Sequence, residues 1–205
     1  MAKAMTGQLI VKPSAESVMA SIQASGKGKG PAPVHLWNPP FCGDLDMRIA
    51  RDGTWFYQGT PIGRAPLVKL FSNILKREGD KYFLVTPVEK VGITVDDAPF
   101  VAVDFEATGA GDQQSIRFTT QVGDHVTANA DTPLRVTRDT ESGEPSPYVM
   151  VRGGLEALID RKSFYRLVDL GVHHPVRQKD GSTQDWFGLW SGGVFFPVIP
   201  SAELR

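Results

Sequence analysis

Few residues in this 205-residue chain have the types and spacing that chemistry requires. Asp44 and Asp46 form an Asp-x-Asp pair. On a strand, residues two apart point to one face, so both carboxylates could hold a Mg²⁺ beside a phosphate. Such pairs are also common at turns and strand edges, where polarity alone explains them. A magnesium-dependent hydrolase or transferase is therefore the alternative interpretation rather than the first one.

The single cysteine and the histidines do not predict a catalytic or metal centre. Neighbouring carboxylates disfavour a thiolate at Cys42, so we interpret it as a buried structural cysteine. A zinc site needs about four ligands with short local spacing, and only His173 and His174 are close in sequence. These two follow a predicted helix end, which favours a capping or surface role. G-x-S-x-G, H-E-x-x-H and complete G-x-G-x-x-G motifs do not occur.

Arg64 is the residue with the clearest binding chemistry. It closes the Gly/Pro-rich segment of residues 59–66, just before a predicted helix. Free backbone N–H groups at a helix N-terminus favour anions, and a guanidinium adds a bidentate phosphate contact. Glu89, with Thr86 close by on the next predicted strand, could accept from a base or ribose hydroxyl, or pair with Arg64. The competing interpretation is an arginine that braces its loop against a carboxylate.

Tryptophans add an aromatic component to this predicted site. Trp37, Trp55, Trp186 and Trp190 lie in or near the predicted structural units. Core packing is the default role for each of them. A tryptophan at a junction between domains can instead stack on a base, so we include Trp37 and Trp55 among the predicted ligand-binding residues.

Composition excludes several classes of function. The chain is 41% apolar and 22% charged, which is ordinary for a soluble globular protein. A formal net charge of −1 provides no electrostatic footprint for nucleic acid or an anionic membrane. One cysteine cannot form an intramolecular disulfide and suits a reducing compartment. The absence of a long apolar run, either as a span or as a signal-peptide centre, predicts a cytoplasmic location.

The first half contains the elements that must position these residues. A helix is predicted over residues 14–25 with Ser14 as its N-cap, followed by a Gly/Pro-rich linker over 26–33. Asp52-Gly53 between two strand-like runs predicts a hairpin with a two-residue turn. A helix is then predicted to run to a stop at Gly79, with a strand from about residue 82. Its apolar stripe comprises Leu67, Leu70, Phe71, Ile74 and Leu75.

The second half is predicted to be mainly antiparallel sheet. Short strands are expected over 91–95, 100–107, 115–122, 126–130 and 134–137, because polar and apolar residues alternate there. Residues 141–147 are expected to form a loop. Strand, Gly153-Gly154 turn, strand, helix over about 162–170 and strand then repeat the order of the first half, which predicts a duplication.

These elements predict an α+β fold with three parts. Residues 1–33 are the N-terminal helix and Gly/Pro linker, 34–87 are a small α+β domain, and 88–205 are a larger antiparallel β domain with one helix. The fold class is therefore α+β with duplicated hairpin–helix–strand units in mostly antiparallel sheet.

Several motifs together resemble a bacterial family, the domain-of-unknown-function 1285 family, over nearly the whole chain. They are W37-N-P-P-F-C-G, R51-D-G-T-W, G59-T-P-I-G-R, L67-V-K-L-F and L84-V-T-P-V-E-K. The resemblance implies two structurally similar halves, of which the C-terminal one is superficially like a pleckstrin-homology domain. It also implies a cleft between them for a nucleotide-like ligand and a role in signal transduction. It implies no enzymatic activity.

We therefore predict a non-enzymatic module that senses a nucleotide-like or phosphorylated small ligand at the domain junction. The predicted ligand-binding residues are Arg64, Glu89, Thr86, Trp37 and Trp55. No catalytic or metal-binding residue is predicted, and the residues identify no cofactor. The alternatives are the magnesium-dependent enzyme that uses Asp44 and Asp46, and a module that binds a protein partner.

Overall fold

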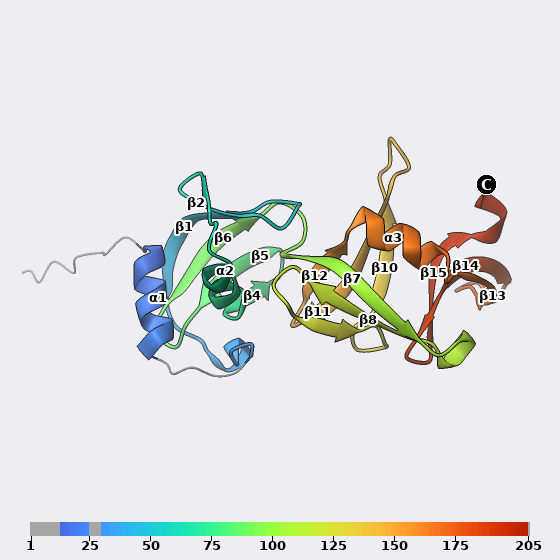
Figure 1. The fold of residues 1–205 in the computed structure, drawn as a ribbon, viewed down its shortest axis with the longest axis horizontal. Coiled ribbons are helices and arrows are strands. Elements are labelled where there is room, and N and C mark those ends of the chain that lie inside the picture. Colours follow the sequence, from blue (N-terminus) through green and yellow to red (C-terminus); the bar gives the residue numbers. More distant parts are fainter. Residues whose placement is uncertain (1–12, 25–29, 205) are drawn as a thin grey trace, which may run out of the picture. The chain divides into compact units, whose positions relative to one another are not determined.

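A computed structural model describes residues 13–24 and 30–204, which divide into two compact units (Figure 1). The first unit comprises Met1–Arg48 and Phe56–Thr94, and the second comprises Ile49–Trp55 and Val95–Arg205. Most of the predicted linker over 26–33 lies outside the described residues. No helix in the described ranges is long and apolar enough to cross a bilayer.

The first unit is built around a six-stranded sheet with the order β3-β2-β1-β6-β5-β4. Its elements are α1 (Ala15–Ala24), η1 (Val34–Leu36), β1 (Phe41–Ile49), β2 (Trp55–Tyr57), β3 (Thr60–Pro61), α2 (Ala65–Ser72), β4 (Leu75–Glu78), β5 (Lys81–Val85) and β6 (Lys90–Val95). The sequence predicts residues 90–95 to be part of the larger second domain. They belong to the first sheet, because β6 pairs antiparallel with β5 across a tight turn.

Helix α1 begins where its capping residues predict. The Ser17 N–H donates to the Ser14 Oγ at 3.1 Å, and the Ser14 N–H donates to the Ser17 Oγ at 3.3 Å. This reciprocal pair satisfies two donors that the first helical turn leaves without partners. Ala15 and Val18 are buried, so the helix also contributes to the core.

Helix α2 is shorter than the helix that its apolar stripe predicts. It ends at Ser72 with Asn73 as its C-cap, and the chain then forms β4. Ile74 and Leu75 are each 2% exposed, so they are core residues as their periodicity required, but Ile74 lies in the turn after α2 and Leu75 lies in β4. Cross-strand pairing of Leu75 with Leu84 decides this, and Gly79, at φ +60°, lies in the β4–β5 turn.

The predicted hairpin around Asp52-Gly53 is present with a longer turn. The Ala50 N–H donates to the Thr54 carbonyl at 2.9 Å, and the Gly53 N–H donates to the Ala50 carbonyl at 2.9 Å. Gly53 has φ +83°, a conformation that costs glycine little. The loop therefore holds three residues, and Arg51 lies inside the turn rather than at the end of a strand.

The second unit contains a six-stranded sheet, with the order β10-β11-β12-β7-β8-β9, and a three-stranded sheet, with the order β13-β14-β15. Its elements are β7 (Phe100–Thr108), η2 (Gly111–Gln113), β8 (Ser115–Thr120), β9 (His125–Thr127), β10 (Leu134–Arg138), β11 (Pro145–Arg152), β12 (Leu155–Ile159), α3 (Arg161–Val168), β13 (Val172–Arg177), β14 (Thr183–Ser191), β15 (Val194–Pro200) and η3 (Ser201–Glu203). Strands β13 and β15 were not predicted. Strand β11 begins inside the expected loop.

Sheet pairing in the second unit is antiparallel except at its centre. Strand β12 pairs parallel with β7, with Ala157 opposite Phe100. The fully buried side chains Phe100, Phe118 and Leu155 belong to the core of this sheet. The buried Ser191 joins the three-stranded sheet to the larger one, because its Oγ accepts from the Ile116 N–H at 2.9 Å and donates to the Ala128 carbonyl at 2.7 Å.

Candidate functional site

Arg64 occupies the position that the sequence predicts. It is the N-cap residue of α2, with φ −96° and ψ 95°, and its side chain is exposed. Pro66 lies in the first turn of the helix, where its missing N–H costs nothing. The Arg64 guanidinium makes no hydrogen bond or ion pair with any residue that the structure describes.

Thr86 and Glu89 hold the turn between β5 and β6. The Thr86 Oγ1 accepts from the N–H groups of Val88 at 3.4 Å and Glu89 at 3.2 Å, and Thr86 is only 1% exposed. The Glu89 Oε1 accepts from the Ser21 Oγ on α1 at 2.8 Å. Among the described residues, Glu89 therefore contacts the first helix and not Arg64.

The two predicted tryptophans lie in different surroundings. Trp55 is 1% exposed and is part of the core. Trp37 is half-buried, and its carbonyl accepts from the Lys76 Nζ at 3.4 Å. None of the five predicted binding residues lines either of the two pockets described below.

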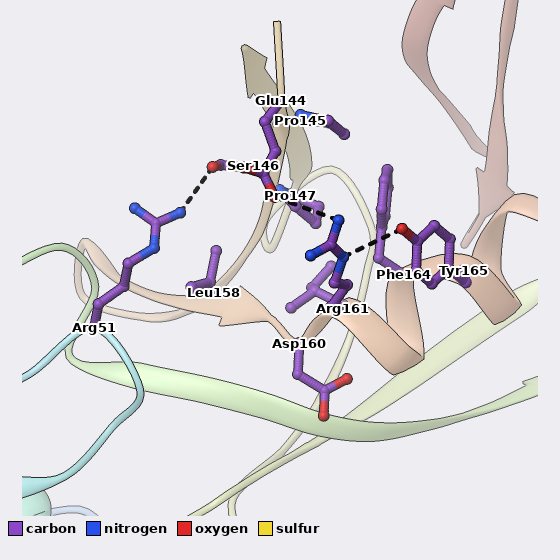
Figure 2. A pocket seen from close by; sticks show the side chains of 11 residues that line it. Arg51, Glu144, Pro145, Ser146, Pro147, Leu158, Asp160, Arg161, Phe164 and Tyr165 are labelled. Atoms are coloured by element: carbon purple, nitrogen blue, oxygen red, sulfur yellow. Dashed lines mark hydrogen bonds and ion pairs between the residues drawn. The ribbon is translucent and has the colours of Figure 1, made fainter. Parts of the chain in front are cut away.

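A pocket of about 220 Å³ lies in the second unit (Figure 2). Three segments form it: the turn that carries Arg51, residues 144–147 at the start of β11, and residues 158–165 at the end of β12 and the start of α3. We call it the Arg51–Arg161 pocket. Its other lining residues are Glu144, Pro145, Ser146, Pro147, Leu158, Ile159, Asp160, Phe164 and Tyr165.

Helix α3 presents Arg161 and Tyr165 on one side of this pocket. The Asp160 carboxylate caps the helix by accepting from the Ser163 N–H at 2.7 Å. Residues four apart are neighbours on a helix, and the Arg161 Nε donates to the Tyr165 hydroxyl at 3.2 Å. Figure 2 shows the Asp160 side chain pointing away from these two residues. Its charge is thus directed at the helix N-terminus rather than at the Arg161 guanidinium.

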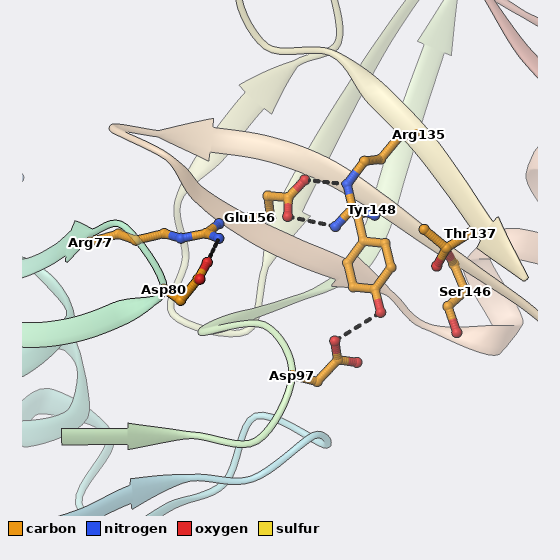
Figure 3. Close-up of polar contacts among 8 residues, drawn as sticks. All are labelled: Arg77, Asp80, Asp97, Arg135, Thr137, Ser146, Tyr148 and Glu156. Atoms are coloured by element: carbon orange, nitrogen blue, oxygen red, sulfur yellow. Dashed lines mark hydrogen bonds and ion pairs between the residues drawn. The ribbon is translucent and has the colours of Figure 1, made fainter. Parts of the chain in front are cut away.

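Arg51 is held at the other side by two partners. Its Nη1 lies 2.9 Å from the Asp97 Oδ2, and its Nη2 donates to the Ser146 Oγ at 2.9 Å. Asp97 also accepts from the Tyr148 hydroxyl at 2.8 Å (Figure 3). The Arg51 side chain nevertheless remains 59% exposed. A guanidinium that is fixed in place and still open to solvent can receive an anion with little loss of side-chain entropy.

Tyr148 also connects this network to a salt bridge on the same sheet. The Arg135 guanidinium forms a bidentate pair with Glu156, with distances of 2.6 and 2.7 Å, and its carbon lies 4.2 Å from the Tyr148 ring centroid (Figure 3). Burial of the Tyr148 phenol, followed by its hydrogen bond to Asp97, raises its pKa above the usual 10.0. The phenol therefore stays protonated and donates its hydrogen bond throughout the neutral range.

Glu144 is the acidic group of the pocket that no strong contact fixes. Its Oε1 lies 3.8 Å from the Arg161 Nη2, and the two side chains are 63% and 75% exposed. An exposed pair at this distance is screened by solvent and contributes little to the stability of the fold. The Arg161 guanidinium is therefore accessible to another anion.

A second pocket of about 220 Å³ lies in the first unit and includes Asp46. Asp44, Asp46 and Arg48 are exposed at alternate positions of β1, so the two carboxylates do share a face. The Arg48 guanidinium carbon lies 4.7 Å above the Phe56 ring. Within the described ranges, no group of three or more His, Cys, Asp or Glu residues could hold a metal ion.

Cys42 is less buried than the sequence suggests, whereas His173 is exposed, as a surface role requires, and His174 is half-buried. Cys42 is half-buried rather than buried, and its Sγ lies 3.5 Å from the Pro40 carbonyl. His173 and His174 lie on β13. The His174 ring packs 5.0 Å from Trp190 and 4.8 Å from Phe195, measured between ring centroids.

Arg51, Arg161 and Tyr165 were not predicted from the sequence as pocket residues. The rule that singled out Arg64, a basic residue at a helix N-terminus, also selects Arg161, which follows the capping residue Asp160. Arg51 has no comparable signal, because only the tertiary structure brings it near residues about 100 positions away in the chain.

The fold and the pocket define an α+β protein of two units with a small arginine-lined pocket in the second. The N-terminal domain model of DUF1285, a domain of unknown function, matches residues 32–98, and the DUF1285 C-terminal domain model matches residues 99–198. The chain therefore belongs to the DUF1285 family, which confirms the resemblance noted from its motifs.

A solved structure with high sequence identity supports the same assignment. The chain is 64% identical to a DUF1285 family protein from Silicibacter pomeroyi DSS-3, with a TM-score of 0.80, covering 91% of this chain and 96% of that one. It is 30% identical to a DUF1285 family protein from Shewanella baltica OS155, with a TM-score of 0.49, covering 61% of this chain and 91% of that one. No curated protein matches the chain.

Proposed function

We propose that this protein is a non-enzymatic, cytoplasmic module that binds a phosphorylated or nucleotide-like small ligand and reports it in signal transduction. We propose the Arg51–Arg161 pocket as the ligand site, ahead of the site around Arg64. The duplication of the two halves and the pleckstrin-homology-like character of the second are part of this proposal.

The observation that carries the proposal is the pair of exposed guanidinium groups in one small pocket. Arg51 and Arg161 come from separate segments, and both line the same cavity beside the Phe164 and Tyr165 rings. Arginine is the side chain best suited to bind phosphate, because its planar fork makes two parallel hydrogen bonds. Apolar walls with a few placed polar groups are typical of small-ligand sites.

A thermal-shift screen of the full chain tests the proposal. The panel comprises phosphate esters, mononucleotides, cyclic nucleotides and dinucleotides, each with and without Mg²⁺. A ligand at 100 times its Kd adds about 2.7 kcal/mol to the free energy of unfolding, which corresponds to an upward shift of about 5–10 °C in Tm. A shift in Arg64→Ala but not in Arg161→Ala would place the ligand in the Arg51–Arg161 pocket.

Lys162→Ala is the matched control, because it removes one positive charge from α3 at an exposed residue that does not line the pocket. The reverse pattern, with binding lost only in Arg64→Ala, would return the site to the helix α2 N-terminus. A flat screen would contradict the proposal and leave the protein-interaction module as the better interpretation.

A further inference from the structure

The size of the Arg51–Arg161 pocket restricts what it can hold. Pockets for drug-sized ligands usually have volumes of about 300–1,000 Å³, whereas this pocket has about 220 Å³. A dinucleotide would lie largely outside it. The volume instead suits a ligand with one small ring and one charged group.

The walls indicate where a ring would lie. Phe164 is half-buried, and Tyr165 is 59% exposed beside it on α3. Pro145 and Pro147, on the opposite segment, add rigid apolar surface to the lining. Planar ring systems, such as nucleic-acid bases, stack well on aromatic side chains.

The charges indicate where an anion would bind and what it would displace. Arg51 already has Asp97 as an ion-pair partner, and Asp97 is only 18% exposed. Among the described residues, the acidic partner of Arg161 is Glu144, and both side chains of this loose pair are mostly exposed. Asp160 is engaged as the helix cap. The Glu144 carboxylate is thus the one acidic group of the lining that can leave at low cost.

We infer that the pocket binds a phosphomonoester that carries one planar ring, and that Glu144 is the internal anion which the phosphate displaces from Arg161. This inference rests on the proposed function and narrows it. A phosphate carries close to two negative charges at neutral pH, whereas a carboxylate carries one, so the ligand competes well for the guanidinium. Tyr165 positions Arg161 through its hydroxyl and offers its ring to the ligand.

Isothermal titration calorimetry of the full chain at pH 7.5 tests the inference with three probes. Phenyl phosphate has both the ring and the double charge, inorganic phosphate lacks the ring, and phenyl sulfate has a single charge. We expect phenyl phosphate to bind at least about 10-fold more tightly than either of the others, because each lacks one contribution of 1.4 kcal/mol or more.

Variants assign the contributions to residues. Glu144→Gln should bind phenyl phosphate about 3- to 10-fold more tightly, because it removes the competing charge and keeps the shape of the side chain. Arg161→Ala should bind about 10- to 100-fold more weakly, since a hydrogen bond to a charged group is lost. Tyr165→Phe should retain the preference for phenyl phosphate over inorganic phosphate, and Tyr165→Leu should lose it. Lys162→Ala should match the unmodified protein.

The outcomes separate this inference from the function on which it rests. Suppose that a phosphorylated compound binds, but that Glu144→Gln binds it no more tightly than the unmodified protein does. The proposed displacement of Glu144 is then wrong, while the proposed ligand-binding function is retained. Equal affinity for phenyl phosphate and inorganic phosphate would overturn the role of the ring. If no phosphorylated compound of the wider screen binds, both ideas fail. Glu144 and Lys162 are exposed, and matching circular dichroism spectra would confirm that these variants are folded.

Discussion

Arg51 and Arg135 show how differently one residue type is used within the second unit. Arg135 forms a bidentate salt bridge with Glu156, packs over Tyr148 and has its pKa raised by the carboxylate. Arg51 has a single ion pair and one hydrogen bond, and much of its guanidinium remains open to solvent. Arg135 therefore stabilises the fold, whereas Arg51 is held in place and can still bind an anion.

Tyr148 should make the protein sensitive to alkaline pH. Its pKa is raised in the folded state, so folding favours the protonated phenol. This contribution to stability is fully present below pH 10 and is lost as the pH rises through the higher folded-state pKa. In Tyr148→Phe we expect about 1 kcal/mol less stability at pH 8, because a hydrogen bond is lost, but a smaller further decrease between pH 8 and pH 10.5.

Urea unfolding of both proteins at the two pH values measures this difference. The two proteins share every ionisable group other than Tyr148, so the difference between their losses of stability isolates the contribution of Tyr148. Parallel losses of stability in the two proteins would show that Tyr148 does not ionise with unfolding.

At the scale of elements, glycines decide how closely strands can approach. A Cβ at Gly188 on β14 would meet the Phe196 carbonyl oxygen and would lie 2.6 Å from the Phe195 ring and 3.0 Å from the Pro197 Cα. Backbone atoms of β15 cannot move aside as a flexible side chain would. The β14–β15 register also shifts between Phe187 and Gly188, where the two strands approach closely.

Gly188→Ala should therefore destabilise the protein strongly. We expect a loss of about 3 kcal/mol, at the upper end for overpacking, because the clash is with backbone. Gly63→Ala is the control, since its Cβ would meet nothing within 4 Å and its φ is not in the left-handed region. Chemical denaturation followed by circular dichroism measures both. A loss below about 1 kcal/mol in Gly188→Ala would mean that β15 shifts to accommodate the methyl group.

At the scale of the whole molecule, the two units are not simple consecutive segments of the chain. Residues 49–55, between β1 and β2 of the first sheet, group with the second unit. The contacts are specific: Arg51 pairs with Asp97, the Asp96 N–H donates to the Ile49 carbonyl at 3.0 Å, and Gly53 lies against Gln121 and Val101. The second unit is thus completed by a piece of the first half of the sequence.

Two glycine substitutions test this organisation. Gly53 and Gly59 both have positive φ, so alanine introduces similar backbone strain at each. A Cβ at Gly53 would also lie 2.9 Å from the Gln121 Nε2 and 3.0 Å from the Val101 Cγ2, whereas at Gly59 it would meet nothing within 4 Å. We expect Gly53→Ala to cost about 1–2 kcal/mol more than Gly59→Ala in urea unfolding. Equal costs would show that the turn does not pack against the rest of the second unit.

Local patterns in the sequence were sufficient to predict many of the elements and the family. The Ser14 cap of α1, the hairpin at Asp52-Gly53 and the alternating strands of the second half depend on neighbouring residues, so their physical causes can be read from short stretches. The exposed N-cap position of Arg64 likewise follows from the residues next to it.

Tertiary contacts decided the rest. Ile74 and Leu75 continue the helical periodicity of α2, but the pairing of Leu75 with β5 ends the helix before them. The parallel pairing of β12 with β7 joins residues more than 50 positions apart, which no local pattern specifies. The Arg51–Arg161 pocket likewise exists only after three distant segments pack together, because the free energy that holds them there comes from burial and pairing across the fold. Short-range patterns therefore accounted for many of the elements and for the family, whereas packing across the fold decided where one element gives way to another and which side chains share a site.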